Sequence, residues 1–269
     1  MSATPTPPVP GETVKLKLAD AVKQAQEAYA KGDLAGTEKI ATAILAKQPH
    51  HIVATQLLAG VAEKRGQSER AIEILQRSLT GGSGDALSLM NLCRIFRLRG
   101  RYDESREAGE RAVAIGTVAD AFVDLADTYT AMNERVRAFE LYERAVAKQP
   151  DMARAHMGLA QALLFKGDFR AGWAEYEWRY RMQNTQNLLP KFKQAQWNGM
   201  ALTASRLLVI CEQGYGDCFQ FARYLPLVSE RAKGVFVGTG PEIKSLMERV
   251  AGDHVCYDRW EHIPPFEFQ

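Results

Sequence analysis

Apolar and small residues recur through most of the chain with a period of about 34 residues. Each period contains two stretches in which apolar positions return at the spacing of an amphipathic helix, separated by a short polar turn. The periods begin at Leu18, Ile52, Ala86, Ala119 and Ala153, so successive starts lie 34, 34, 33 and 34 residues apart. The pattern therefore predicts five consecutive helical hairpins over residues 18–186.

Two further features mark each hairpin. The turn contains a residue that tolerates a left-handed backbone, and the second helix has a small residue where it crosses the first. The turn residues are Gly32, Gly66, Gly100, Asn133 and Gly167, and the small residues are Thr37, Ala71, Ser105, Ala138 and Gly172. This arrangement resembles the tetratricopeptide repeat (TPR). Because one hairpin cannot bury its apolar face alone, the resemblance implies a mainly α-helical, right-handed superhelix whose concave wall holds another polypeptide.

The chain changes character near residue 185. Residues 187–204 lack a helical period and contain Pro190, which predicts a connector. Further on, short apolar runs alternate with helical stretches, and this alternation predicts a partial parallel, Rossmann-like α/β segment over residues 205–269. The runs expected to be strands are residues 207–211, 235–237 and 254–257.

Prolines shape the two helices expected between these strands. The first should extend from Cys218 to Lys233 and be bent or divided by Pro226. The second should begin at Pro241, since proline is tolerated as a first helical residue.

Composition agrees with a soluble protein and excludes several function classes. Among 269 residues, 46% are hydrophobic, 25% are charged, and the net charge is +2, which gives no electrostatic case for nucleic acid. No apolar run is long enough to span a membrane. The proline-rich residues 1–17 lack a secretory signal and predict a disordered lead-in to a cytoplasmic protein. The four cysteines form no CxxC pair, so we expect reduced thiols and no metal site.

Four segments carry a second resemblance: Phe169–Arg179, Trp197–Gly199, Glu212–Pro226 and Pro264–Glu267. Together they resemble bacterial TPR-fused glycosyltransferases, relatives of the heptosyltransferases, some of which glycosylate proteins such as flagellin. The resemblance implies a two-lobed GT-B fold that takes a nucleotide sugar as donor. Only 65 residues follow Ala204, fewer than one lobe of roughly 150 residues. We therefore expect an incomplete N-terminal GT-B lobe that binds no cofactor and transfers no sugar.

A glycine-rich turn follows the first expected strand. It consists of Glu212, Gln213, Gly214, Tyr215 and Gly216, and Asp217 ends it. The carboxyl end of a strand is where open α/β sheets bind ligands, and the following helix N-terminus favours anionic groups. By resemblance, Asp217 is the base that takes a proton from the acceptor hydroxyl. The alternatives are that Asp217 caps the helix and that Glu212 and Gln213 only pack the loop.

Charged residues mark the expected inner wall. Asp120, Asp124 and Asp127 share one helix face, and Arg94 and Arg97 should lie beside them. One interpretation is mutual neutralisation between neighbouring helices. The other is a bipolar groove for a peptide or helix, with methionine and valine as adaptable apolar contacts. The candidate groove residues are Met90, Asn91, Arg94, Arg97, Asp120, Val123, Asp124, Asp127, Met157 and Gln161.

Two function classes follow from these patterns. In the first, the chain is the acceptor-protein-binding arm and partial acceptor lobe of a bacterial protein glycosyltransferase. In the second, it is a TPR adaptor or chaperone scaffold that binds a partner protein and performs no chemistry. An open sheet edge in residues 205–269 would also allow homo-oligomerisation.

Overall fold

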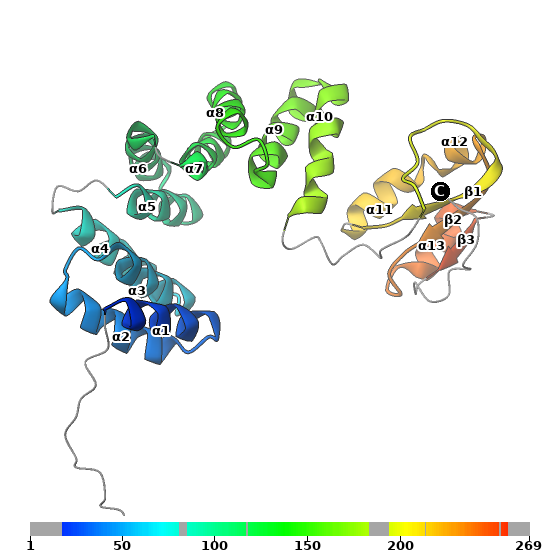
Figure 1. Cartoon of the computed structure of the whole chain (residues 1–269). Helices are drawn as coiled ribbons and strands as arrows, with labels where there is room; N and C mark the ends of the chain where they lie inside the picture. Colours follow the sequence, from blue (N-terminus) through cyan, green and yellow to red (C-terminus); the bar gives the residue numbers. More distant parts are fainter. Residues whose placement is uncertain are drawn as a thin grey trace, which may run out of the picture. The chain divides into compact units, whose positions relative to one another are not determined.

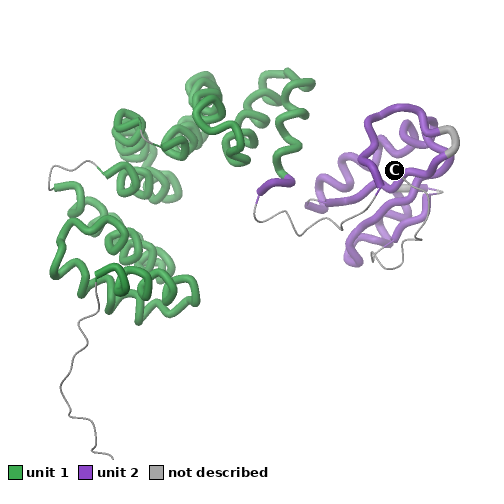
Figure 2. The backbone as a smooth tube through the Cα atoms, viewed as in Figure 1, with its two compact units in different colours: residues 1–179 green, residues 180–269 purple. Residues whose placement is uncertain are grey.

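The computed structural model describes residues 18–80, 85–116, 118–182, 194–212, 214–252 and 254–257. The chain divides into two compact units, Met1–Arg179 and Tyr180–Gln269 (Figure 2). The predicted lead-in at 1–17, Gln213 and residues 187–193 of the predicted connector lie outside the described residues.

The described part of the first unit contains ten α-helices arranged as five hairpins (Figure 1). Each first helix begins at the residue where the periodic pattern places it, and the mainly helical repeat fold is confirmed. A 3-10 helix, Glu177–Arg181, follows the last hairpin. The pairs are α1 (Leu18–Ala30) with α2 (Leu34–Lys47), α3 (Ile52–Lys64) with α4 (Ser68–Leu79), α5 (Ala86–Leu98) with α6 (Tyr102–Ile115), α7 (Ala119–Ala131) with α8 (Arg135–Lys148), and α9 (Ala153–Lys166) with α10 (Phe169–Tyr176).

The turn within each hairpin reverses the chain by a left-handed residue. The four turn glycines have φ between 72° and 88°, and Asn133 reaches 63°, a region that asparagine tolerates better than most residues. In the first and last hairpins an aspartate then caps the second helix. The side chain of Asp33 accepts from the Gly36 N–H at 2.8 Å, and that of Asp168 accepts from the Ala171 N–H at 3.2 Å.

The predicted small residues lie at the crossing of the two helices and are buried. Thr37, Ala71 and Ser105 have no exposed surface, and Ala138 is 1% exposed. At Gly172 even a Cβ atom would lie 2.8 Å from Leu164 side-chain atoms. The helices can therefore approach closely only because these side chains are small.

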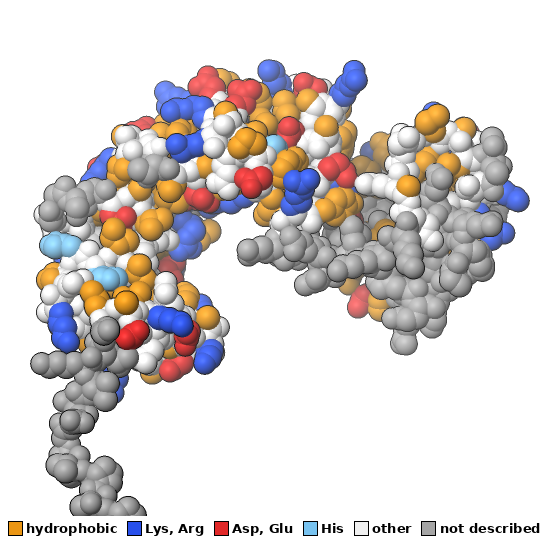
Figure 3. Space-filling view, in the orientation of Figure 1, with side chains coloured by type: hydrophobic (Ala, Val, Ile, Leu, Met, Phe, Trp, Pro, Cys, Tyr) orange, Lys and Arg blue, Asp and Glu red, His pale blue; other side chains and the backbone are white. Residues whose placement is uncertain are grey.

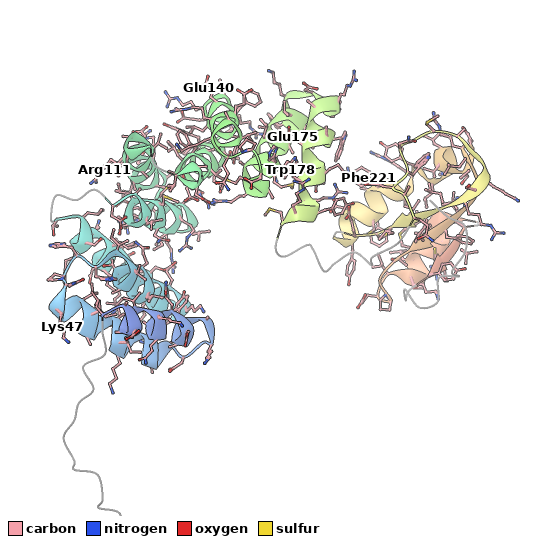
Figure 4. The ribbon with its side chains drawn as sticks, in the orientation of Figure 1. Lys47, Arg111, Glu140, Glu175, Trp178 and Phe221 are labelled. Carbon is pink, nitrogen blue, oxygen red and sulfur yellow. The ribbon has the colours of Figure 1, made fainter. Side chains whose placement is uncertain are left out.

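The last repeat contains a buried histidine, His156, near the start of its first helix. The ring of His156 stacks on Trp178 with centroids 3.8 Å apart, and its Nε2 lies 2.9 Å from the Pro150 carbonyl oxygen. Its Nδ1 contacts the Glu175 carboxylate. Glu175 and Trp178 are labelled in Figure 4, at the end of α10 and in the following 3-10 helix. These contacts tie α9 to the segments on both sides of it.

The second unit contains a small parallel sheet in the order β1-β2-β3. Met247 and Val237 are the most completely buried members of its core, which also contains Cys218 and Cys256. The helices lie between successive strands along the chain, as parallel pairing requires. The elements are β1 (Leu202–Ile210), α11 (Tyr215–Ala222), α12 (Leu225–Ser229), β2 (Ala232–Gly238), α13 (Lys244–Ala251) and β3 (Val255–Tyr257).

Three details differ from or refine the sequence prediction. Strand β1 begins at Leu202, before its apolar run, because the Leu202 N–H donates to the Arg231 carbonyl at 2.5 Å. The helix expected from residue 218 to 233 is divided, with Pro226 in the first turn of α12. The prediction that Pro241 opens a helix is wrong: it lies in a turn closed by the bond from the Ile243 N–H to the Gly240 carbonyl.

One packing contact gives a test of the close helix approach. A Cβ atom at Gly158 on α9 would lie 2.2 Å from the Tyr142 ring of α8. We expect Gly158→Ala to destabilise the helical unit by about 1–3 kcal/mol, because the ring must move. Urea unfolding followed by circular dichroism measures the change. In a Tyr142→Leu background the same substitution should cost clearly less, and an equal cost in both backgrounds would show that the ring is not the cause.

Candidate peptide-binding groove

The first helices form one continuous wall of the helical unit. Helices α1, α3, α5, α7 and α9 each pack directly on the next member of this series. Equivalent positions on neighbouring first helices therefore lie one repeat apart. On the second helices, Arg111 of α6 and Glu140 of α8 are exposed, and both are labelled in Figure 4. Figure 3 shows charges of both signs interspersed with apolar patches over this unit.

Arg154 is the main partner of the three aspartates on α7. Its Nη2 lies 2.5 Å from Asp124 Oδ1 and 2.7 Å from Asp127 Oδ2, and its Nη1 lies 4.0 Å from Asp120 Oδ1. The prediction that Arg94 and Arg97 both serve this role is wrong for Arg94. Of these two arginines, only Arg97 has an ion pair with the cluster in the described part of the chain, at 3.5 Å from Asp127. Arg154 reaches all three acids because it lies on α9, the first helix of the next repeat, and faces α7.

Asp124 belongs to the interior rather than to the groove surface. Its side chain is only 7% exposed. Burial raises the pKa of its carboxyl, and the attraction of Arg154 opposes that rise. A carboxylate in this position is stable because a guanidinium pairs with it directly.

Tyr142 completes the cluster from a second helix. Its hydroxyl donates to Asp127 Oδ1 at 2.7 Å, and its ring passes the bare Cα of Gly158. Burial and the neighbouring Asp127 carboxylate raise the pKa of Tyr142. The acids of α7 are thus satisfied within the repeats. This geometry favours mutual neutralisation over a groove that awaits a basic partner.

The other predicted groove residues also divide into a buried one and exposed ones. Val123 has no exposed surface and packs in the core, so its assignment to the groove is wrong. Met90 and Met157 are partly exposed, and Gln161 is exposed. Helical spacing identifies the face of α7, but it does not show which edge of that face the neighbouring helices cover.

A hollow of about 300 Å³ lies on the wall of the first three repeats. Asn91 Nδ2 donates to Gln56 Oε1, and Gln56 Nε2 donates onward to Ser88 Oγ at 3.0 Å. Gln26, Tyr29, Gln56 and Glu63 are absent from the sequence prediction. The repeat register could have identified two of them, since Gln56 and Glu63 precede Met90 and Arg97 by 34 residues. The polar lining residues are Gln26, Tyr29, Gln56, Glu63, Asn91 and Arg94.

The turn after β1 forms a separate candidate site in the second unit. Gly214 is the N-cap of α11, and Asp217 lies in the first helical turn, where its side chain is exposed. The alternative that Asp217 caps the helix is wrong, because α11 has no side-chain cap and begins three residues before the expected start. Gly216 and Tyr215 are exposed beside it. Glu212 accepts a hydrogen bond from the Tyr180 hydroxyl at 3.3 Å.

Within the described residues, no helix is long and apolar enough to cross a membrane. The same residues contain no group of three or more His, Cys, Asp or Glu side chains with the geometry of a metal site.

Comparison with known proteins shows what the repeats are similar to. A family model described as tetratricopeptide repeat matches residues 57–120 and 123–176. The chain is also 29% identical over 194 residues to protein FlbA of Caulobacter vibrioides. That match covers 68% of this chain and 31% of FlbA, so the chain spans about a third of that relative's length. Residues 57–120 and 123–176 of the helical unit are therefore similar to tetratricopeptide repeats.

Solved structures share this fold. PilF of Pseudomonas aeruginosa superposes with a TM-score of 0.57 at 17% identity, covering 64% of this chain and 79% of PilF. Yeast Tom70 gives a TM-score of 0.56 at 15% identity, covering 63% of this chain and 37% of Tom70. At these identities the likeness concerns the fold alone.

The buried ion cluster yields a stability prediction. Asp124→Lys places a second cation beside Arg154 in a site with little water, so we expect a loss of about 3–5 kcal/mol of folding stability. Asp120→Lys is the matched control, because the Asp120 side chain is 48% exposed; its cost should stay within about 1 kcal/mol. Thermal unfolding of both variants measures the difference, and equal costs would place Asp124 on the surface.

Proposed function

We propose that the chain is a protein-interaction module that binds an extended or helical segment of a partner protein on the wall of its first helices. The supporting observation is that five repeats present one continuous first-helix face with a hollow in it. Stacked helical repeats of this kind create extended binding surfaces. The balanced charge of the chain favours a protein partner over nucleic acid. We further propose a cytoplasmic location, from the composition.

A peptide selection tests this proposal. A phage-displayed library of random 12-residue peptides is selected on the intact chain. We expect binders that are weakened about 10-fold or more by Gln26→Trp or Gln161→Trp, because both residues are exposed on first helices and a large ring there fills the wall. Fluorescence anisotropy of the synthetic peptides measures the affinity.

Matched variants on the second helices control for the added tryptophan. Arg111→Trp and Glu140→Trp are exposed on α6 and α8 and should leave the affinity unchanged. Binders that respond to the second-helix variants and not to the first-helix variants would contradict the proposal. A selection that yields no binder would contradict it as well.

A second candidate function adds chemistry to this binding role. Here the chain is the acceptor-binding arm and partial acceptor lobe of a protein glycosyltransferase, which uses a nucleotide sugar and acts on a protein such as flagellin. The supporting observation is an exposed carboxylate, Asp217, in the first turn of α11, directly after the first strand of a parallel sheet. An exposed carboxylate can act as a base wherever an acceptor hydroxyl reaches hydrogen-bond distance. Pairing of two copies through the outer edges of β1 or β3 is part of the same proposal.

The natural full-length protein tests the second candidate. With a nucleotide sugar and the partner protein, Asp217→Asn should lower transfer by about 100-fold or more, because the amide keeps the shape and removes the base. Binding of the partner should remain unchanged, and Glu230→Gln, at an exposed glutamate after α12, serves as the control. Mass spectrometry of the partner measures transfer. Turnover that stays within a few-fold of the parent would remove Asp217 from any catalytic role.

A further inference from the structure

The two halves of the first-helix wall differ in how well their polar groups are satisfied. In the fourth and fifth repeats, Asp124 and Asp127 both pair with Arg154. In the first three repeats, polar groups with spare hydrogen-bonding capacity line one hollow of about 300 Å³. A ligand gains most where it satisfies groups that the folded chain leaves without partners. The hollow is therefore the part of the wall where side-chain recognition can be specific.

Arg94 and Glu63 are the charged groups of this hollow. Among the described residues, the side chain of the half-buried Arg94 has no hydrogen bond or ion pair. Glu63 Oε1 is buried and has no hydrogen-bond partner there. Both side chains line the hollow, yet they form no ion pair within 4.0 Å. The hollow thus offers a strong donor and a strong acceptor that are separated from each other.

The neutral polar groups of the hollow already form some hydrogen bonds within the chain. Asn91 donates to Gln56, which in turn donates to Ser88 Oγ at 3.0 Å, so these amide donors point along the wall. The Ser88 hydroxyl donates to Asp85, which caps α5. This relay fixes the amide of Asn91 beside Arg94 on α5. It also ties the hollow to the start of that helix, so the lining is held in place before a ligand arrives.

The inventory of donors and acceptors selects the ligand. A carboxylate only accepts and would face the Glu63 carboxylate, whereas an ammonium only donates and would face the Arg94 guanidinium. An aliphatic group would cover both charges and satisfy neither. A primary carboxamide has an oxygen that accepts and an NH₂ that donates, on separate atoms. It can bond to Arg94 with the oxygen and to Glu63 with the nitrogen.

We infer that this hollow binds the carboxamide side chain of an asparagine or glutamine in the partner segment. The inference rests on the proposed function, because it assumes that a polypeptide lies along the first-helix wall. It adds a chemical specificity that the repeat fold alone does not supply. Gly60 contributes by leaving room for the Tyr29 ring, since a Cβ atom there would lie 2.6 Å from the Tyr29 hydroxyl oxygen.

The experiment uses the peptides selected from the random 12-residue library on the intact chain. Those weakened by Gln26→Trp should share an asparagine or glutamine. Synthetic versions with aspartate, lysine or leucine at that place should bind about 10-fold or more weakly, since each leaves a charged group without a partner. Fluorescence anisotropy gives the affinities, and circular dichroism confirms that each protein variant is folded.

Two nearly isosteric substitutions should change the specificity in opposite directions. In Glu63→Gln the remaining charge is Arg94, so the aspartate or glutamate version of the peptide should recover binding. In Arg94→Gln the remaining charge is Glu63, so the lysine version should recover it. Arg111→Gln and Glu140→Gln, at exposed sites on the second helices, should leave the preference unchanged.

The outcomes separate this inference from the proposed function. If peptides bind the wall but tolerate every substitution of asparagine and glutamine within two-fold, the inference is overturned and the binding role stands. A serine or threonine that serves equally well, or binding that responds only to Gln161→Trp, would overturn it in the same way. If no selected peptide responds to a variant on the first helices, the proposed function itself fails.

Discussion

The close crossing of the two helices in each hairpin is the constraint on which the helical unit depends. A small side chain at the crossing lets each second helix pack deep against its partner, and the first helices then contact one another along one face. Where the small residue is polar, its hydroxyl is satisfied locally. Thr37 Oγ1 donates to the Asp33 carbonyl at 2.7 Å and Ser105 Oγ to the Cys93 carbonyl at 2.7 Å. A larger residue at these places would separate the helices, and the wall would no longer be continuous.

The wall that this packing creates serves structure and recognition in different repeats. A close cation offsets the desolvation of a buried carboxylate, and Arg154 does this for Asp124. Because Arg154 and Asp124 are paired with each other, a partner protein could bind either group only by breaking the pair, at a large cost in free energy. Arg94, one repeat before the acids, has no such commitment among the described residues. Arginines on different first helices thus have different roles, which depend on whether a neighbouring first helix supplies a counter-charge.

The sequence predicts the repeat architecture well because the residues that recur with the period determine the backbone conformation of each hairpin. Turn residues such as Gly32 and Asn133 adopt the left-handed conformation that their chemistry favours. Ion pairing between repeats is less accessible to sequence reasoning, since the rotation from one first helix to the next decides whether Arg94 or Arg154 reaches the acids. The start of strand β1 could not be predicted for another reason. Its position at Leu202 depends on backbone pairing with the segment before β2, and backbone pairing leaves no side-chain pattern in the sequence.

The two candidate functions use the same wall, and only one of them also needs Asp217. Glu63 and Arg94 belong to the helical unit, and Asp217 belongs to the α/β unit. Contacts of a partner segment with the hollow are the same before and during any reaction elsewhere on that partner. Such uniform binding lowers the partner concentration needed for half-maximal rate and leaves the rate of the chemical step unchanged. Recognition in the hollow is therefore physically independent of chemistry at Asp217, and a repeat wall with this specificity serves a scaffold and an enzyme's acceptor-binding arm equally well.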